Sequence, residues 1–195
     1  MGIYKLVDNV KVYGLENSFR VSKFPMQVEV NKCTEEFTDR IKTLACCEKG
    51  SGHDNFLKGI VVQFDLSFTV KAWTEAERYH WFDIVSSQSS MHRISKMNYD
   101  ECFCKYVTDN TKFEMDRLKE IYNNNKTPEN YLYLLYNCPT GLILTAGITT
   151  NYQQLKTIYG QRLNHRLPEW KEFCKFIESL PHSELITGEK EEDSK

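Results

Sequence analysis

The sequence predicts a single domain of the α/β (α+β) class, which contains both strands and helices. Residues 59–70 alternate apolar and polar side chains, as expected of a strand with one buried face. Residues 111–123, 151–162 and 169–180 instead repeat apolar side chains at helical spacing. The chain has 195 residues, of which 41% are hydrophobic, so it is long enough for one core and short for two.

The N-terminal part is predicted to form two short strands and one helix. Residues 3–13 alternate loosely and end at Gly14, which indicates a strand followed by a break. Residues 28–30 predict a second short strand. Thr34 precedes apolar residues at helical spacing that continue to residue 45, so it is the expected N-cap of a helix.

The strand at 59–70 is the clearest in the sequence, with Phe64, Leu66 and Phe68 on its predicted buried face. Thr74 is the expected cap of a helix over 75–85.

The C-terminal half is predicted to form four helices and one apolar strand or buried turn. The first of these helices should turn Phe113, Leu118 and Ile121 inward, and Thr127 should cap the second. The expected ranges in chain order are 111–123, 128–136, 142–149, 151–162 and 169–180.

Charge and composition exclude several classes of function. Lys and Arg number 25 against 27 Asp and Glu, so a net charge of -2 argues against bulk binding of nucleic acid. No apolar run reaches the roughly 20 residues of a membrane helix. Seven cysteines without a signal peptide predict reduced thiols in the cytoplasm, at spacings that predict no zinc site. The domain is expected over 1–187 and a disordered charged tail over 188–195.

Three polar islands could carry chemistry. Residues 52–57 place His53 before the clearest strand, where it could meet a ligand or belong to a polar turn. Residues 88–98 gather an amide, an imidazole, a guanidinium and an ammonium, which suits an anionic ligand or a solvated loop. Asn151 and Arg162 lie three helical turns apart, about 16 Å, near one face of a predicted helix.

Taken in order, these islands resemble the flavin-dependent thymidylate synthases. The first matches the family's Gly-His motif before a strand. The second matches the signature Arg-His-Arg-x-x-Ser-x-Asn-Glu, and Gln88 precedes His92 by the family's four residues. Pro139, Asn151 and Arg162 repeat its gaps of twelve and eleven residues.

The resemblance spans most of residues 5–180 and implies a mixed sheet flanked by helices, in a homotetramer with sites shared between chains. It implies an enzyme that methylates dUMP to dTMP reductively with FAD, methylenetetrahydrofolate as one-carbon donor and NADPH as reductant. Its partners would be a small nucleotide and a folate, with no nucleic acid polymer and no membrane. The implied flavin-binding residues are His53, Asn55, His92, Arg93, Asn98 and Asn151. The implied nucleotide-binding residues are Gln88, Lys96 and Arg162, and the implied catalytic residues are His92, Arg93 and Arg162.

The signature departs from the family pattern at several positions. Met91, Lys96 and Tyr99 stand in place of its first Arg, its Ser and its Glu. The acidic pair 100–101 follows where the family has a Ser and a phosphate-binding Arg, and two carboxylates would repel a phosphate. Lys96 or Lys105 could replace the lost Arg.

Three functions therefore stay open. The chain could be a working flavin-dependent thymidylate synthase. It could be a divergent homologue that binds flavin or a nucleotide, with an altered substrate or no synthase activity. It could also be a small binding module without a cofactor, in which the spacing matches by chance. Compared with the family, the chain carries an extra segment at about 73–82, which is expected to be a packing helix.

Overall fold

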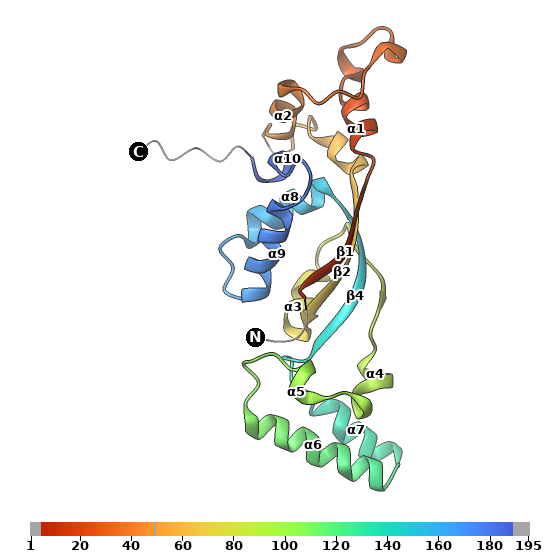
Figure 1. Ribbon diagram of the computed structural model, residues 1–195, viewed down its shortest axis with the longest axis vertical. Helices are drawn as coiled ribbons and strands as arrows, with labels where there is room; N and C mark the ends of the chain where they lie inside the picture. Colours follow the sequence, from red (N-terminus) through yellow and green to blue (C-terminus); the bar gives the residue numbers. More distant parts are fainter. Residues whose placement is uncertain (1–4, 49, 189–195) are drawn as a thin grey trace, which may run out of the picture.

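The computed structural model describes residues 5–48 and 50–188. Figure 1 shows an elongated molecule with a sheet in its middle part and a helical hairpin at one end. The predicted tail, apart from residue 188, and residues 3 and 4 of the first predicted strand lie outside the described residues. Among the described residues, no helix combines the length and the apolarity that a membrane span requires.

The sheet has four strands in the order β1–β2–β4–β3. They are β1 (Val7–Tyr13), β2 (Val61–Thr69), β3 (Phe82–Ser87) and β4 (Ile143–Asn151). The predicted α+β class is confirmed, but the sheet is antiparallel rather than mixed. The reason is that β1 runs opposite to β2, and β4 lies between β2 and β3 and runs opposite to both, so no two neighbouring strands are parallel.

Ten α-helices and four 3₁₀ turns occur in the described residues. The helices are α1 (Leu15–Ser22), α2 (Asp39–Ala45), α3 (Val70–Ala76), α4 (Ser90–Arg93), α5 (Tyr99–Cys102), α6 (Asp109–Asn124), α7 (Pro128–Tyr136), α8 (Tyr152–Arg162), α9 (Pro168–Glu178) and α10 (Glu184–Thr187). The turns are η1 (Phe24–Met26), η2 (Val30–Lys32), η3 (Asn55–Gly59) and η4 (Ile94–Lys96).

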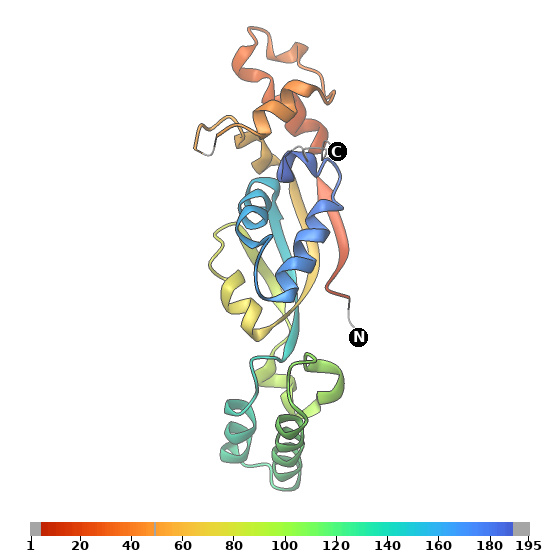
Figure 2. The same ribbon diagram turned by 90° about the vertical axis from the view of Figure 1, so that its left-hand side faces the viewer.

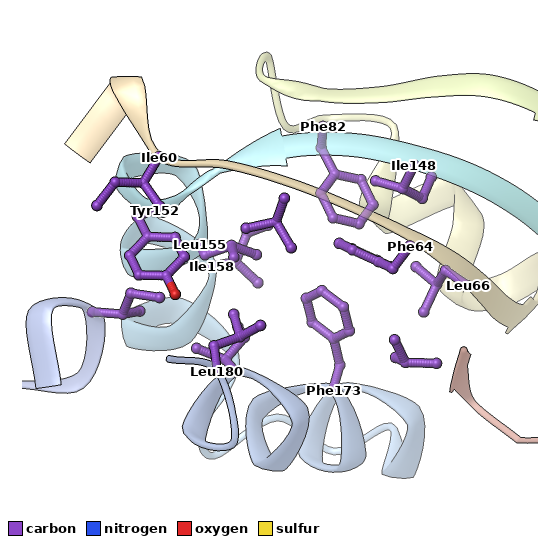
Figure 3. Close-up of a cluster of buried hydrophobic side chains, with 14 of the residues drawn as sticks. Ile60, Phe64, Leu66, Phe82, Ile148, Tyr152, Leu155, Ile158, Phe173 and Leu180 are labelled. Atoms are coloured by element: carbon purple, nitrogen blue, oxygen red, sulfur yellow. The ribbon is translucent and has the colours of Figure 1, made fainter. Parts of the chain in front are cut away.

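The main core lies between one face of the sheet and the helices α8 and α9, which Figures 1 and 2 show on the same side of the strands. Phe64, Leu66 and Phe68 of β2 are buried there, as the alternation predicts. The rings of Phe64 and Phe173 approach to 5.8 Å between centroids, and Figure 3 shows Phe173 reaching from α9 toward the sheet. This contact holds α9 against the sheet.

A second, smaller core fills the hairpin of α6 and α7 and holds the segment that contains η4 and α5. Met115 and Leu118 face this core, whereas Phe113 and Ile121 are exposed, so their predicted inward orientation is wrong. The helix α6 packs mainly on α7 and on the segment from η4 to α5, and a narrow contact buries only a narrow stripe of its side chains.

Two predictions for the N-terminal part are wrong. Residues 28–30 form no strand; Val28 is fully exposed, so it has no apolar face to bury in a sheet. The helix predicted from Thr34 begins at Asp39 instead. Thr34 serves a different contact, because Lys23 Nζ donates to its carbonyl oxygen at 2.8 Å and to its hydroxyl at 2.9 Å.

The helix predicted over 75–85 is also wrong. The helix α3 starts earlier, with the Thr69 hydroxyl accepting a hydrogen bond from Ala72 N at 3.2 Å, and it ends at Ala76. Residues 82–87 form a strand because Phe82 is buried in the main core and the segment pairs with β4. Tertiary pairing here overrides local helix propensity.

Candidate functional site

An open pocket of about 760 Å³ lies beside α8, and we call it the α8 pocket. Its walls come from the turn before η3, from the residue before β3 and from one face of α8. The polar and aromatic side chains that matter below are Asp54, Asn55, Trp81, Gln154, Lys156 and Gln161. A volume of this size is typical of cofactor and substrate sites, which span about 300–1,000 Å³.

The junction of β4 and α8 orients this helix. Asn151 ends the strand, and its side-chain oxygen accepts a hydrogen bond from Gln154 N at 2.9 Å, so it caps α8. Leu155 and Ile158 then face the main core. Residues 153–154, 156–157 and 160–161 line the pocket on another side of the helix.

The charged groups of the α8 pocket neutralise one another. Lys156 Nζ lies 2.9 Å from Asp54 Oδ2 and 2.5 Å from the carbonyl oxygen of Ala45. Gln153 Nε2 donates to Asp54 Oδ1 at 3.1 Å, and Asp54 is only 8% exposed. A buried carboxylate paired in this way is a structural anchor, which leaves the pocket with amide groups and little free charge.

Trp81 gives the pocket an aromatic wall. Its main chain is fixed on both sides, because its N–H donates to Gln154 Oε1 at 3.3 Å and its carbonyl oxygen accepts from the Thr150 hydroxyl at 2.6 Å. Its side chain is 53% exposed. An aromatic ring beside several amides suits a flat heterocycle, which can stack on the ring and bond to the amides through its edge.

The structure brings parts of the first and third islands together. Asn55 lines the α8 pocket, and its side-chain oxygen accepts a hydrogen bond from Gln153 Nε2 at 3.4 Å. His53 is exposed in the adjoining turn. Asn151 lies at the start of α8, so these three predicted residues share one end of the sheet.

The second island lies at the opposite end of β4. Gln88 pairs with Thr145, with its N–H 2.9 Å from the carbonyl oxygen and its side-chain oxygen 3.0 Å from the amide nitrogen. Thr145 and Asn151 are six residues apart on one strand, which separates the two ends by about 20 Å. Within one chain, the second island therefore does not reach the α8 pocket (Figure 1).

The other predicted residues of the second island lie near the hairpin of α6 and α7. His92 and Arg93 are exposed on the short helix α4. Asn98 caps α5, because its side-chain oxygen accepts a hydrogen bond from Asp100 N at 3.2 Å. Lys96 and Lys105 are both exposed.

Arg162 lies on the core side of α8 and does not line the α8 pocket. Its Nη1 lies 2.8 Å from Glu75 Oε2, its Nε donates to the Tyr79 hydroxyl at 2.6 Å, and its guanidinium carbon is 4.7 Å from the centre of the Trp170 ring. Both partners of the ion pair are nearly buried, with the Arg162 side chain 13% and the Glu75 side chain 12% exposed.

The surroundings of Glu75 favour its charged form. Burial raises the pKa of this carboxyl, but hydrogen bonds from Lys71 and Trp170 and the charges of His165 and Arg162 lower it more, so the pKa lies below its ordinary value of 4.5. Glu75 is therefore ionised at neutral pH and needs its cationic partners.

Three of the thiols, those of Cys102, Cys138 and Cys174, favour the protonated form at neutral pH. Burial raises the pKa of Cys102 to about 11, that of Cys138 to about 12 and that of Cys174 to about 11. The described residues hold no group of three or more His, Cys, Asp or Glu side chains placed to bind a metal ion.

Sequence reasoning missed Trp81, Gln154, Lys156 and Gln161. A signal for the last three was present, because polar side chains recur at 153–154, 156–157 and 161, which is close to the spacing of one helix face. Trp81 had no such signal, since its place in the pocket depends on how β3 pairs with β4.

No protein-family model and no curated protein matches the chain. Solved structures do match. A crystal structure of flavin-dependent thymidylate synthase ThyX from Helicobacter pylori, complexed with FAD and dUMP, has a TM-score of 0.73 at 13% identity and covers 94% of this chain and 97% of its own. The chain has the ThyX fold. A second ThyX structure from Helicobacter pylori with FAD and dUMP has a TM-score of 0.74 at 12% identity and covers 93% of this chain and 96% of its own. At such low identity the likeness to ThyX extends to the fold alone.

Proposed function

We propose that this protein is a flavin-dependent thymidylate synthase-like enzyme. It would bind FAD and methylate dUMP to dTMP reductively, with methylenetetrahydrofolate as carbon donor and NADPH as reductant. The observation that supports this most is a ThyX fold over 94% of the chain, in which a pocket suited to a flat heterocycle lies where Asn55 and the start of α8 meet. FAD would supply the redox chemistry, and the chain would bind and orient it.

The α8 pocket fits the rings of FAD better than its diphosphate. Trp81 offers a stacking surface, and Asn55 and Gln154 offer amides at the edge of a ring. Lys156, which would otherwise attract a diphosphate, is already paired with Asp54. We therefore assign the contacts with the diphosphate to His92 and Arg93 of a second copy, in a homotetramer with shared sites.

The absorbance spectrum of the purified protein tests this proposal. We expect a flavin band near about 450 nm that grows when FAD is added. Replacing Trp81 with Ala should weaken FAD binding roughly tenfold or more, because a stacking surface is lost. Tyr136→Ala, which truncates an exposed aromatic residue on α7, is the matched control and should leave FAD binding unchanged. A colourless protein that ignores added FAD would contradict the proposal.

A second candidate is a divergent homologue that binds flavin but has an altered nucleotide site. The observation that favours it is the ion pair of Arg162 with Glu75, which engages the residue expected to contact the nucleotide. The exposed acidic residues Asp100 and Glu101 add to this, since they replace a phosphate-binding position.

Calorimetry with dUMP in the presence of FAD separates the two candidates. Micromolar binding supports the synthase. Loss of two charge-assisted contacts, at about 1.5–3 kcal/mol each, would instead weaken binding by roughly two to four orders of magnitude. Undetectable binding to a protein that does bind FAD therefore supports the divergent homologue.

A further inference from the structure

Four donors from three elements and a loop converge on the carboxylate of Glu75. Arg162 Nη1, Trp170 Nε1 and His165 Nε2 lie 2.8, 3.1 and 3.2 Å from Oε2, and Lys71 Nζ lies 3.3 Å from Oε1. Charged and neutral donors thus surround one carboxylate, in the way that a protein surrounds a bound anion.

The carboxylate also forms part of the wall of an open pocket of about 470 Å³, next to the α8 pocket. Of the described residues that line it, Lys71, His165 and Arg166 are basic and Glu75 is the single acid. Arg162 lies behind Glu75, seen from this pocket, because it does not line the pocket yet contacts the carboxylate. Positive groups therefore outnumber negative ones around this site, which favours an anion.

Glu75 lies on α3 and Tyr79 on the loop after it. Both residues fall within the extra segment at about 73–82, which the family pattern lacks. Both bond to Arg162, so this segment determines what the guanidinium contacts. The packing helix expected at 73–82 is thus shorter than predicted, and it carries the partner of a buried Arg.

We propose that Glu75 is a specificity-determining residue that fills an anion site formed by Arg162, Lys71 and His165, and so closes this site to ligands that carry a phosphate or carboxylate. The chain supplies its own anion where a ligand could bind. The consequence of this closure for dUMP binding rests on the proposed function, in which Arg162 would contact the nucleotide.

Removal of the carboxylate tests the proposal. In the full chain without FAD, Glu75→Ala should lower the melting temperature, and added formate should raise it again by filling the vacated site. We expect formate, inorganic phosphate and dUMP each to bind Glu75→Ala about tenfold more tightly than the wild type, measured from the concentration dependence of the melting temperature. A purely packing role for Glu75 would give the loss of stability without the response to anions.

Matched variants make the outcome decisive. Glu77→Ala removes an exposed acid two residues away and should respond to anions as the wild type does. Adding Arg162→Met to Glu75→Ala should abolish the response. If Glu75→Ala does not fold, Glu75→Ser also removes the carboxylate and leaves its place open, so the same comparison applies. Equal anion responses of the wild type and the Glu75 variant would overturn the proposal.

The two proposals fail separately in this design. Flavin absorbance of the same preparations reports on the proposed function. A protein that binds no FAD but shows the anion response only without Glu75 retains the anion site and loses the synthase assignment. A protein that binds FAD while its Glu75 variant ignores anions keeps the synthase assignment and loses the anion site.

Discussion

Replacing Arg162 with Met is expected to lower the free energy of unfolding by about 3–5 kcal/mol, because it leaves the Glu75 carboxylate buried without its closest partner. The Tyr79 hydroxyl would also lose its donor. Met keeps much of the length and apolar volume of the Arg side chain, so the loss reports mainly on charge and hydrogen bonding rather than on a cavity. Urea denaturation at neutral pH, followed by tryptophan fluorescence, measures the effect.

Arg117 provides the matched control. It pairs with Glu114 through two hydrogen bonds of 2.6 and 2.7 Å, but both side chains are about half exposed on α6. Arg117→Met should therefore cost far less, since water can solvate the remaining carboxylate. Similar losses of unfolding free energy in the two variants would show that the pair of Glu75 and Arg162 stabilises the protein no more than an exposed ion pair does.

Two variants, inactive when tested singly, are expected to regain activity when mixed, if the proposed shared site is correct. Arg93→Ala removes a cation of the second island. Gly160→Trp fills the α8 pocket, because a Cβ at Gly160 meets no atom within 4 Å and the residue lines that pocket. Since the two lesions lie at opposite ends of β4, each chain keeps the half that the other lacks.

Mixing the denatured variants in equal amounts and refolding them should restore about a quarter of the sites, the fraction that combines an intact pocket with an intact second island by random assembly. dTMP formation per milligram of protein measures this. Each variant refolded alone is the control. No recovery in oligomers that contain both variants would contradict a site shared between chains.

Local signals in the sequence predicted much of the fold. The alternation of β2 and the cap at Thr127 depend on neighbouring residues, and both are confirmed. The strand β3 was missed because its pairing partner lies about sixty residues further along the chain. The start of α2 was missed because Thr34 is engaged by Lys23.

The candidate site was less predictable for the same reason. Asn55 and Asn151 were identified from a motif, and both lie by the start of α8. The contacts that set the charge of the site join residues about a hundred positions apart, as in Asp54 with Lys156 and Glu75 with Arg162. A single sequence carries no local pattern for such pairs, so the engagement of Arg162 could be seen only in three dimensions.

The small core of the α6–α7 hairpin has a consequence for how this protein can diverge. The signature segment takes its position from Ile94 and Tyr99 in that core, whereas the α8 pocket takes its position from the layer of α8 and α9 on the sheet. Mutations that repack the hairpin can therefore shift the second island while the α8 pocket keeps its shape. Selection can therefore tune the second island and the α8 pocket separately while the scaffold that carries both is kept.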